Sequence, residues 1–312
     1  MKKTIALLSG GISSEREVSL NSGDQVFQSL DATKYEIRRY DPKTDLPRLI
    51  AEASQIDAAL IILHGPYGED GTVQGLLELL DIPYQGAGVL GSALAMNKLA
   101  AKQIYEAQGL PVPAHVVVER SQRPPTDELV RQLGLPLVVK PATAGSSIGM
   151  SIARHAEELP QALECALEYD TRILVEAYID GIEITGAVLG NDAPQALPLI
   201  EIIPDKEHLF FDYEAKYTAG VTQEICPARI DAALTEKAQE FAVRAHQALY
   251  CTGYSRTDMM VRGNEIFVLE TNTIPGMTPT SLFPQAAQAA GISFSRLLDR
   301  LIELGIQAHH RR

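Results

Sequence analysis

The chain has 312 residues, of which 46% are hydrophobic, and it carries a formal net charge of −13. A single hydrophobic core stops growing at roughly 250–300 residues, so this length predicts two or three domains. The acidic balance argues against nonspecific binding to nucleic acid or to an anionic membrane, because both require a basic surface.

Cysteine usage and the first residues bear on location. Cys165, Cys226 and Cys251 are far apart and show no Cys-x-x-Cys spacing, which is typical of unpaired thiols in a reducing compartment. The start "MKKTIALLSGG" resembles a signal peptide, but its apolar part is too short for one. No stretch of about 20 apolar residues follows. A cytoplasmic protein without a membrane span is therefore expected.

Short apolar runs alternate with helical patterns in the first third of the chain. The predicted order is strand "TIALLS", helix 15–30, strand "YEIRRY", a helix around "LPRLIAEA" and strand "AALIIL". This alternation predicts βαβ units around a mostly parallel sheet. Ligands collect at the carboxyl ends of such strands, so the loops "SGGISSER" (9–16) and "HGPYGEDGT" (64–72) are candidate site loops, with His64 at a strand end.

The segment "GAGVLG" fits the dinucleotide pattern Gly-x-Gly-x-x-Gly at Gly86, Gly88 and Gly91. The preceding "LDIPYQ" contains Pro83 and makes a poor central strand, and no strand-terminal acid follows about 20 residues later. These glycines therefore indicate a tight turn before a long helix at 92–108. A nicotinamide-dependent oxidoreductase without a need for Mg²⁺ is the alternative that they leave open.

The middle third contains "LPLVVKPATAGSSIGMSIA" (135–153), which predicts a strand, a Gly/Ser-rich loop and a second strand. A helix near 155–169 and the strand "RILVEAYI" follow. Lys140 ends the first strand beside the loop, whose N–H groups can face phosphate oxygens. Lys98 and Lys216 are further candidate cations.

The last third contributes strands near 182–190 and 195–203, an irregular segment "PDKEHLFFDYEAKYTAGVTQEICPA" and a helix at 231–249. Long irregular segments in compact domains usually form lids or binding loops. The strands "SRTDMMV" and "EIFVLE", helices near 284–290 and 294–305, and a disordered terminal "HHRR" complete the prediction.

Glu270 and Asn272 face the same side of an extended strand that ends in "ETNTIPGM". If the preceding strand pairs in register across the "RGNE" turn, Asp258 joins them and Arg256 shares their face. Three hard oxygen ligands without His or Cys indicate Mg²⁺ or Mn²⁺. A salt bridge of Arg256 with a carboxylate is the simpler alternative.

Seven motifs together resemble the D-alanine:D-alanine ligase family of the ATP-grasp superfamily. They are "GGISSEREVSLNSG", "LHGPYGEDGTVQGLLELLDIPYQGAG", "MNK", "VVKPATAGSSIGM", "EAKY", "SRTDMMV" and "LETNTIPGMTPTSLFP", in family order from residue 4 to about 305. The resemblance implies an α/β protein with the ATP-grasp fold. Its parts would be a Rossmann-like substrate domain (1–95), a central ATP-grasp domain (96–182) and a C-terminal catalytic domain (183–312).

The resemblance also implies ATP and two Mg²⁺ ions, with Mn²⁺ as a substitute. The ATP-binding residues would be Lys98, Lys140, Ser147, Glu176, Ala177, Ile179, Glu183 and Lys216, and the metal ligands Asp258, Glu270 and Asn272. One D-alanine would form an acylphosphate, which the amine of a second D-alanine would attack. The catalytic residues would be Glu15, Ser146, Tyr217, Arg256 and Gly276, and the other substrate contacts His64, Ser281 and Leu282.

Two positions in these motifs bear on binding. By analogy with related ligases, Tyr217 in "EAKY" favours D-alanine as the second substrate. Ala144 stands where the family commonly has an acidic residue before Gly-Ser-Ser, a departure that bears on loop dynamics or nucleotide affinity. A D-alanine:D-lactate or D-alanine:D-serine ligase, and a nucleotide-binding protein without turnover, remain alternatives. The family further implies a homodimer and a role in peptidoglycan synthesis in a bacterial cytoplasm.

Overall fold

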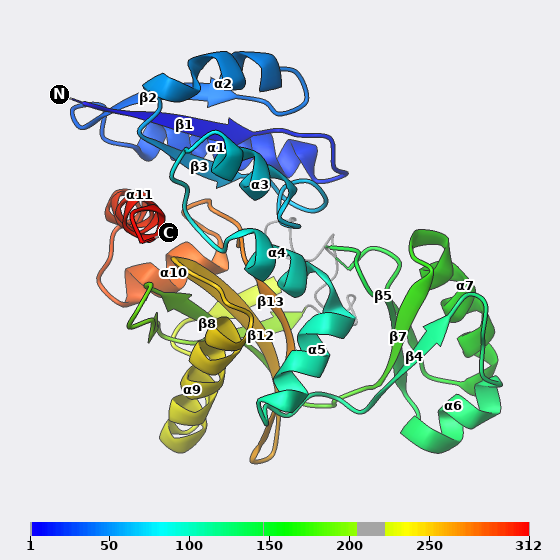
Figure 1. The fold of residues 1–312 in the computed structure, drawn as a ribbon. Coiled ribbons are helices and arrows are strands. Elements are labelled where there is room, and N and C mark those ends of the chain that lie inside the picture. The colour runs from blue at the N-terminus through cyan, green and yellow to red at the C-terminus, as the bar shows by residue number, and fades with distance from the viewer. Residues whose placement is uncertain (1, 146, 205–221, 312) are drawn as a thin grey trace.

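The computed structural model describes residues 2–145, 147–204 and 222–311, and its chain folds around three β-sheets (Figure 1). Lys216, Tyr217 and Ser146, which the sequence singled out, lie outside the described residues. Within the described ranges, no helix has the length and apolar character of a membrane span.

The N-terminal sheet is parallel, with strand order β2-β1-β3. In chain order, its strands and the helices between and after them are β1 (Lys3–Ser9), α1 (Arg16–Ser29), β2 (Tyr35–Tyr40), α2 (Leu46–Glu52), η1 (Ala53–Gln55), β3 (Ala58–Ile62) and α3 (Thr72–Leu79). β3 is buried along its whole length, as continuous apolar strands of parallel sheets are. The predicted βαβ arrangement is confirmed, and both candidate loops follow strands of this sheet.

The middle sheet is antiparallel, with strand order β4-β7-β5-β6. Its elements are β4 (His115–Glu119), α6 (Thr126–Leu133), β5 (Leu137–Pro141), β6 (Ser151–Ala153), η2 (Ala156–Glu158), α7 (Leu159–Tyr169) and β7 (Arg172–Ala177). Helices α6 and α7 lie together in the lobe at the right of Figure 1 and share a buried core with the strands. The Gly/Ser-rich loop joins β5 to β6.

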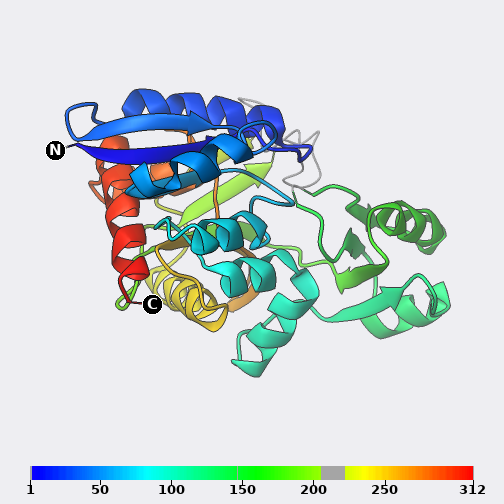
Figure 2. The ribbon, with the colours of Figure 1, turned by 45° about the horizontal axis from the view of Figure 1, so that its top comes forward.

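The C-terminal sheet is antiparallel and has the order β11-β10-β8-β12-β13, with β9 beside β8. Its elements are β8 (Ile182–Leu189), β9 (Gln195–Ala196), β10 (Ile200–Pro204), β11 (Thr222–Ile225), α9 (Ala232–Ala248), β12 (Tyr254–Arg262), β13 (Glu265–Asn272), α10 (Leu282–Ala289) and α11 (Phe294–His309). Helix α11 returns to pack against β3, and so joins the last residues to the first sheet (Figure 2).

The single long helix predicted at 92–108 is wrong. The structure has two helices, α4 (Val89–Met96) and α5 (Lys98–Ala107), because Asn97 between them is extended (φ −91°, ψ 100°). The Asn97 side chain caps α5 by accepting a hydrogen bond from the N–H of Ala100, and the N–H of Lys98 donates to the carbonyl of Ala142 (2.8 Å). The break turns the start of α5 toward the Gly/Ser-rich loop.

Three smaller expectations also change. The strand expected at 195–203 is divided into β9 and β10, and β11 lies within the segment predicted to be irregular. The "HHRR" end was predicted to be disordered, but α11 extends to His309, whose Nε2 lies 3.0 Å from Oδ1 of Asp81. Each sheet lies inside one predicted domain range, except that β8 begins at Ile182, one residue before the predicted boundary. Helix α5 lies in the predicted central range but packs on β13 and α9 of the C-terminal range.

Candidate active site

Two cavities meet where the three sheets approach one another. The first has a volume of about 370 Å³ and lies between the N-terminal sheet and the end of the β12–β13 hairpin. The second, of about 640 Å³, lies between the middle and C-terminal sheets. Lys98 and Glu270 line both cavities, and their side chains form an ion pair of 3.1 Å.

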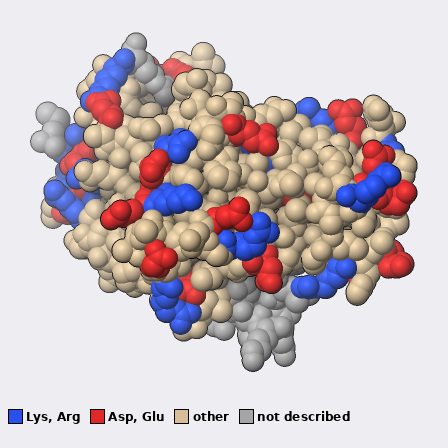
Figure 3. Space-filling model, turned by 90° about the horizontal axis from the view of Figure 1, so that it is seen from below, with Lys and Arg blue, Asp and Glu red and all other residues tan. Residues whose placement is uncertain are grey.

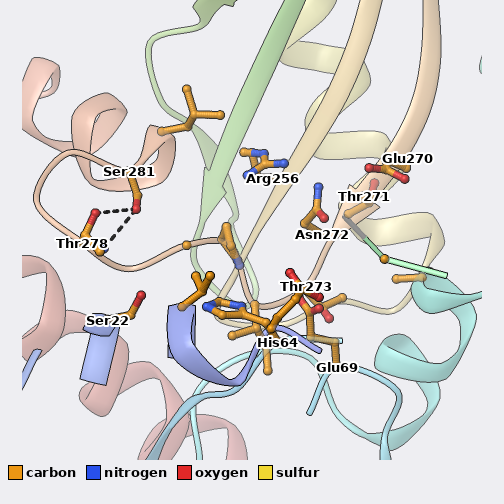
Figure 4. A pocket seen from close by; sticks show the side chains of 18 of the residues that line it. Ser22, His64, Glu69, Arg256, Glu270, Thr271, Asn272, Thr273, Thr278 and Ser281 are labelled. Atoms are coloured by element: carbon orange, nitrogen blue, oxygen red, sulfur yellow. Dashed lines mark hydrogen bonds between the residues drawn. The ribbon is translucent and has the colours of Figure 1, made fainter. Parts of the chain in front are cut away.

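The β12–β13 hairpin supplies the centre of the site. Its register pairs Asp258 with Glu270 and Arg256 with Asn272, so the four side chains come together at one end of the sheet. Figure 4 shows Arg256, Asn272 and Glu270 projecting from these strands toward the first cavity. The register therefore brings together the three predicted oxygen ligands.

Three side chains hold Asp258 through four hydrogen bonds. Arg256 forms a two-pronged contact through Nε (2.9 Å) and Nη2 (2.7 Å), Thr185 donates its hydroxyl (2.6 Å), and Asn272 donates Nδ2 (3.2 Å). The salt bridge weighed as the simpler alternative is thus present. It is largely buried, because the side chains of Arg256 and Asp258 are only 11% and 7% exposed.

The donor set fits a hard divalent cation. Asp258 and Glu270 offer carboxylate oxygens and Asn272 a carboxamide oxygen, and water or phosphate oxygens would complete such a shell. In the ranges that the structure describes, no cluster of three or more His, Cys, Asp or Glu side chains provides a richer site. These residues could therefore hold a metal only together with another oxygen-rich ligand.

Side chains from the loops after β1 and β3 face the hairpin across the first cavity. Glu15 at the start of α1 and His64 after β3 are both buried. Burial lowers the pKa of His64, although the charge of Glu15 acts in the opposite direction. Among the described residues, Nε2 of His64 has no hydrogen-bond partner. A neutral imidazole is therefore the favoured form near neutral pH.

Glu69 is a cavity residue that the sequence did not single out. Burial, together with the charge of Glu15, raises the pKa of Glu69 to about 8. Its Oε2 accepts the N–H of Gly65 (2.6 Å), and a Cβ at Gly65 would lie 2.9 Å from Oε2 of Glu15. The left-handed Gly65 (φ 71°) allows the two carboxylates to approach. The sequence did contain a signal for this residue, because Glu69 is an acidic residue in the glycine-rich loop that follows β3.

The loop before α10 closes the opposite end of the first cavity. Ser281 precedes α10, and its Oγ accepts the N–H of Thr278 (3.1 Å) and contacts the Thr278 hydroxyl (2.8 Å), as Figure 4 shows. A Cβ at Gly276 would lie 3.0 Å from Oγ of Ser281, so only a small residue fits there easily. Leu282 begins the helix, where backbone N–H groups are free of intrahelical partners.

The second cavity combines an apolar surface with charged groups. Its apolar lining includes Ile152, Ile179, Ile202, Met260 and Leu269. The charged or polar lining includes Lys98, Lys140, Ser147, Glu176, Glu183 and Asp258. Such a surface suits a ligand with a flat apolar part and an anionic part.

Lys98 connects the Gly/Ser-rich loop to the hairpin. Its Nζ donates to the carbonyl of Ala144 (2.8 Å), the position where an acidic residue was expected from the family pattern. Gly145 lines the first cavity, and a Cβ there would lie 3.4 Å from Oε2 of Glu15. The loop thus approaches Glu15 at Gly145.

Every described residue proposed from the sequence lines one of the two cavities. The first contains Glu15, His64, Lys98, Arg256, Glu270, Asn272, Gly276, Ser281 and Leu282, and the second Lys98, Lys140, Ser147, Glu176, Ala177, Ile179, Glu183, Asp258 and Glu270. Besides Glu69, the sequence missed Glu224 at the first cavity and Lys102, a buried partner of Glu176.

Two family models match this chain. Residues 38–87 match the family model described as "D-ala D-ala ligase N-terminus", and residues 104–303 match "D-ala D-ala ligase C-terminus". A D-alanine–D-alanine ligase of Syntrophobacter fumaroxidans is 64% identical over 306 residues, covering 98% of each chain. One from Desulfotalea psychrophila is 55% identical, covering 97% of this chain and 95% of its own.

Solved structures agree over nearly the whole chain. The D-alanine–D-alanine ligase from Bacillus anthracis, crystallised with ATP, has a TM-score of 0.86 at 37% identity and covers 99% of both chains. The VanG D-Ala:D-Ser ligase from Enterococcus faecalis has a TM-score of 0.83 at 36% identity, covering 97% of this chain and 99% of its own. The same fold therefore occurs with two different second substrates.

Proposed function

The chain belongs to the D-alanine:D-alanine ligase family, which has the ATP-grasp fold, and we propose that it joins two D-alanine molecules with conversion of ATP to ADP and phosphate. The product, D-alanyl-D-alanine, serves peptidoglycan precursor synthesis. The observation that carries this proposal is the junction of two cavities at Lys98 and Glu270, one suited to a nucleotide and one to small zwitterions.

ATP occupies the second cavity. Adenine lies against the apolar surface, with Glu176 and the backbone at Ala177 and Ile179 as its polar contacts. Glu183 binds the ribose. Lys98 and Lys140 bind the α- and β-phosphates under the loop that contains Ser147, and Lys216 reaches the γ-phosphate.

Asp258, Glu270 and Asn272 bind two Mg²⁺ ions, for which Mn²⁺ can substitute. When bound, such ions neutralise phosphate oxygens and orient the γ-phosphoryl group. Four hydrogen bonds from protein side chains fix the Asp258 carboxylate, which supports its role as a preorganised metal ligand.

The D-alanine substrates occupy the first cavity. Glu15 binds the ammonium of the first D-alanine, and His64 lies near its carboxylate. Ser281 and the N–H of Leu282 bind the carboxylate of the second, as the exposed N–H groups at a helix start can do. Ser146 and Tyr217 complete a hydrogen-bonded group with Glu15 that closes the site.

The reaction needs no protein nucleophile. A carboxylate oxygen of the first D-alanine attacks the γ-phosphorus, ADP leaves, and an acylphosphate forms. The amine of the second D-alanine then attacks the acyl carbon, and phosphate and a proton leave. The guanidinium of Arg256 and the N–H of Gly276 stabilise the oxyanion, so catalysis rests on positioning and charge.

We extend the proposal to organisation and partners. The chain divides into domains 1–95, 96–182 and 183–312 and acts in the cytoplasm as a homodimer. Its net charge of −13, with acidic and basic groups interspersed on the face in Figure 3, supports small-molecule substrates and no nucleic-acid partner.

The decisive experiment measures phosphate release from Mg-ATP with D-alanine, L-alanine, or D-alanine mixed with D-serine or D-lactate, and identifies products by mass. We expect release that depends on D-alanine, with the dipeptide as the main product. A mixed product with D-serine or D-lactate would reassign the second pocket. Absence of release with every amino acid would contradict the ligase function.

A further inference from the structure

A buried cluster of three charges lies behind the second cavity. Lys102 lies one turn after Lys98 on α5, and its side chain is fully buried. Its Nζ is 3.1 Å from Oε1 of Glu176, and Nζ of Lys140 is 3.0 Å from Oε2 of the same carboxylate. Each oxygen of Glu176 therefore faces one ammonium group.

Lys102 differs from the other two members in what it can reach. Lys140 and Glu176 line the second cavity, whereas Lys102 lines neither of the two cavities. Lys102 reaches the Glu176 carboxylate from the side that faces away from the cavity. It does so from α5, which packs on β13 of the C-terminal sheet. Its ion pair with Glu176 is the contact through which Lys102 can act on a ligand bound in the second cavity.

The burial of Lys102 requires a reason. Transferring an ammonium group into the protein interior costs several kcal/mol, and replacing a whole buried ion-pair cluster by apolar residues of similar volume is often neutral or stabilising. Burial acts to raise the pKa of Glu176, but the charges of Lys102 and Lys140 outweigh it and hold that pKa below its usual value. Lys102 thus favours the ionised form of a carboxylate in the cavity wall.

An ionised carboxylate only accepts hydrogen bonds, and it has lone pairs beyond the two that face lysines. It can therefore accept the 6-amino group of adenine. A purine with a 6-keto oxygen would instead place a second hydrogen-bond acceptor against the Glu176 carboxylate. Two acceptors cannot form a hydrogen bond with each other, so this contact is unfavourable. A protonated or displaced Glu176 would lose this discrimination.

Building on the proposed contact of Glu176 with adenine, we propose that Lys102 is a positioning residue for nucleotide selection. It holds Glu176 in place as an ionised acceptor, so that the cavity binds 6-aminopurine nucleotides and rejects 6-ketopurine nucleotides. Lys102 itself does not touch the nucleotide.

The test compares kcat/KM for ATP with kcat/KM for inosine triphosphate in the Lys102→Met variant, at saturating Mg²⁺ and D-alanine. We expect the ATP-to-ITP ratio to fall about tenfold or more, because one charge-assisted hydrogen bond is weakened. The KM for D-alanine should stay unchanged. A folded Lys102→Met protein with the wild-type ratio would overturn the proposal.

Two further variants separate selection from a general effect. Lys237→Met removes an exposed lysine from α9 and should leave the ratio unchanged. Glu176→Gln should lower the ratio, and adding Lys102→Met to it should produce no further fall if Lys102 acts only through Glu176. An unchanged ratio in Glu176→Gln would overturn the proposal even if Lys102→Met failed to fold.

The wild-type protein distinguishes this inference from the proposed function. Lack of D-alanine-dependent phosphate release would contradict the ligase activity, while ATP and ITP binding could still be compared by calorimetry. A wild-type protein that binds ATP and ITP equally would contradict the selection by Glu176 and Lys102 and leave the ligase activity intact.

Discussion

Arg256 combines two tasks in one side chain, because it fixes Asp258 through both carboxylate oxygens and faces the first cavity. Lysine preserves the charge but not the planar fork. We expect Arg256→Lys to lower kcat about 100-fold, as loss of a well-placed oxyanion donor does, with a smaller effect on KM for ATP. Steady-state phosphate release measures this.

An arginine on the exposed surface of α6 provides the matched control. Arg131→Lys should retain wild-type kcat, because Arg131 lies outside both cavities. If Arg256→Lys and the wild-type protein had equal kcat, the proposed stabilisation of the oxyanion by Arg256 would be contradicted.

Glu69 gives the free energy of unfolding a dependence on pH. Because burial raises its pKa from 4.5 to about 8, the folded state binds more protons than the unfolded state between these values. This contribution to stability is full below about pH 4.5 and is lost as the pH rises toward 8. Glu69→Gln should therefore become more stable relative to wild type from pH 5 to pH 8.

Urea unfolding at several pH values measures this difference for the protein without ligands. Glu128→Gln, at an exposed position of α6, should follow the wild-type pH dependence. A constant difference between Glu69→Gln and wild type across this range would show that Glu69 does not titrate there.

At the scale of single elements, the break at Asn97 directs Lys98 toward the Gly/Ser-rich loop. Asn97→Ala removes the cap of α5 and should cost about 1 kcal/mol in the free energy of unfolding. The KM for ATP should rise as well, because Lys98 is the first residue of α5 and its backbone would be held less firmly without the cap. Asn97→Ser retains a capping oxygen and should restore both values.

Urea unfolding and ATP kinetics on the three proteins measure both effects. If Asn97→Ala changed stability but left KM for ATP unaltered, the cap would stabilise α5 without positioning Lys98.

The same break shows what the sequence can and cannot predict about elements. Strands such as β1 and β3 were predicted because their buried side chains are contiguous along the chain. The division of 92–108 was missed because the pattern of apolar residues continues through Asn97, and the break depends on contacts with Ala142 in a distant loop. Local patterns do not contain such contacts.

At the scale of the whole molecule, the site is formed by all three sheets. Motifs predicted the residue types, because Asp258, Glu270 and Asn272 need only the register of one hairpin. The approach of Glu69 to Glu15, and of Lys102 to Glu176, depends on how separate elements pack. Only the folded structure provides that packing.

Oligomerisation is a property of the whole surface, and an apolar patch on α3, α4 and the turn after α9 supports the proposed dimer. Leu79, Val89, Leu90 and Tyr250 are 88%, 38%, 57% and 65% exposed. They belong to adjacent elements, since α3 contacts α4 and Gly91 of α4 lies close to the carbonyl of Tyr250. A patch of this kind often marks a protein–protein interface.

Sedimentation equilibrium tests this interface. The wild-type protein should sediment at twice the chain mass of 33.9 kDa, whereas the Leu79→Glu/Leu90→Glu variant should sediment at the chain mass, because charges cannot be buried without partners. Ile50→Glu, an exposed apolar position on α2, should remain dimeric. If the double variant also remained dimeric, the two copies would have to meet at another surface, and a monomeric wild-type protein would contradict the homodimer itself.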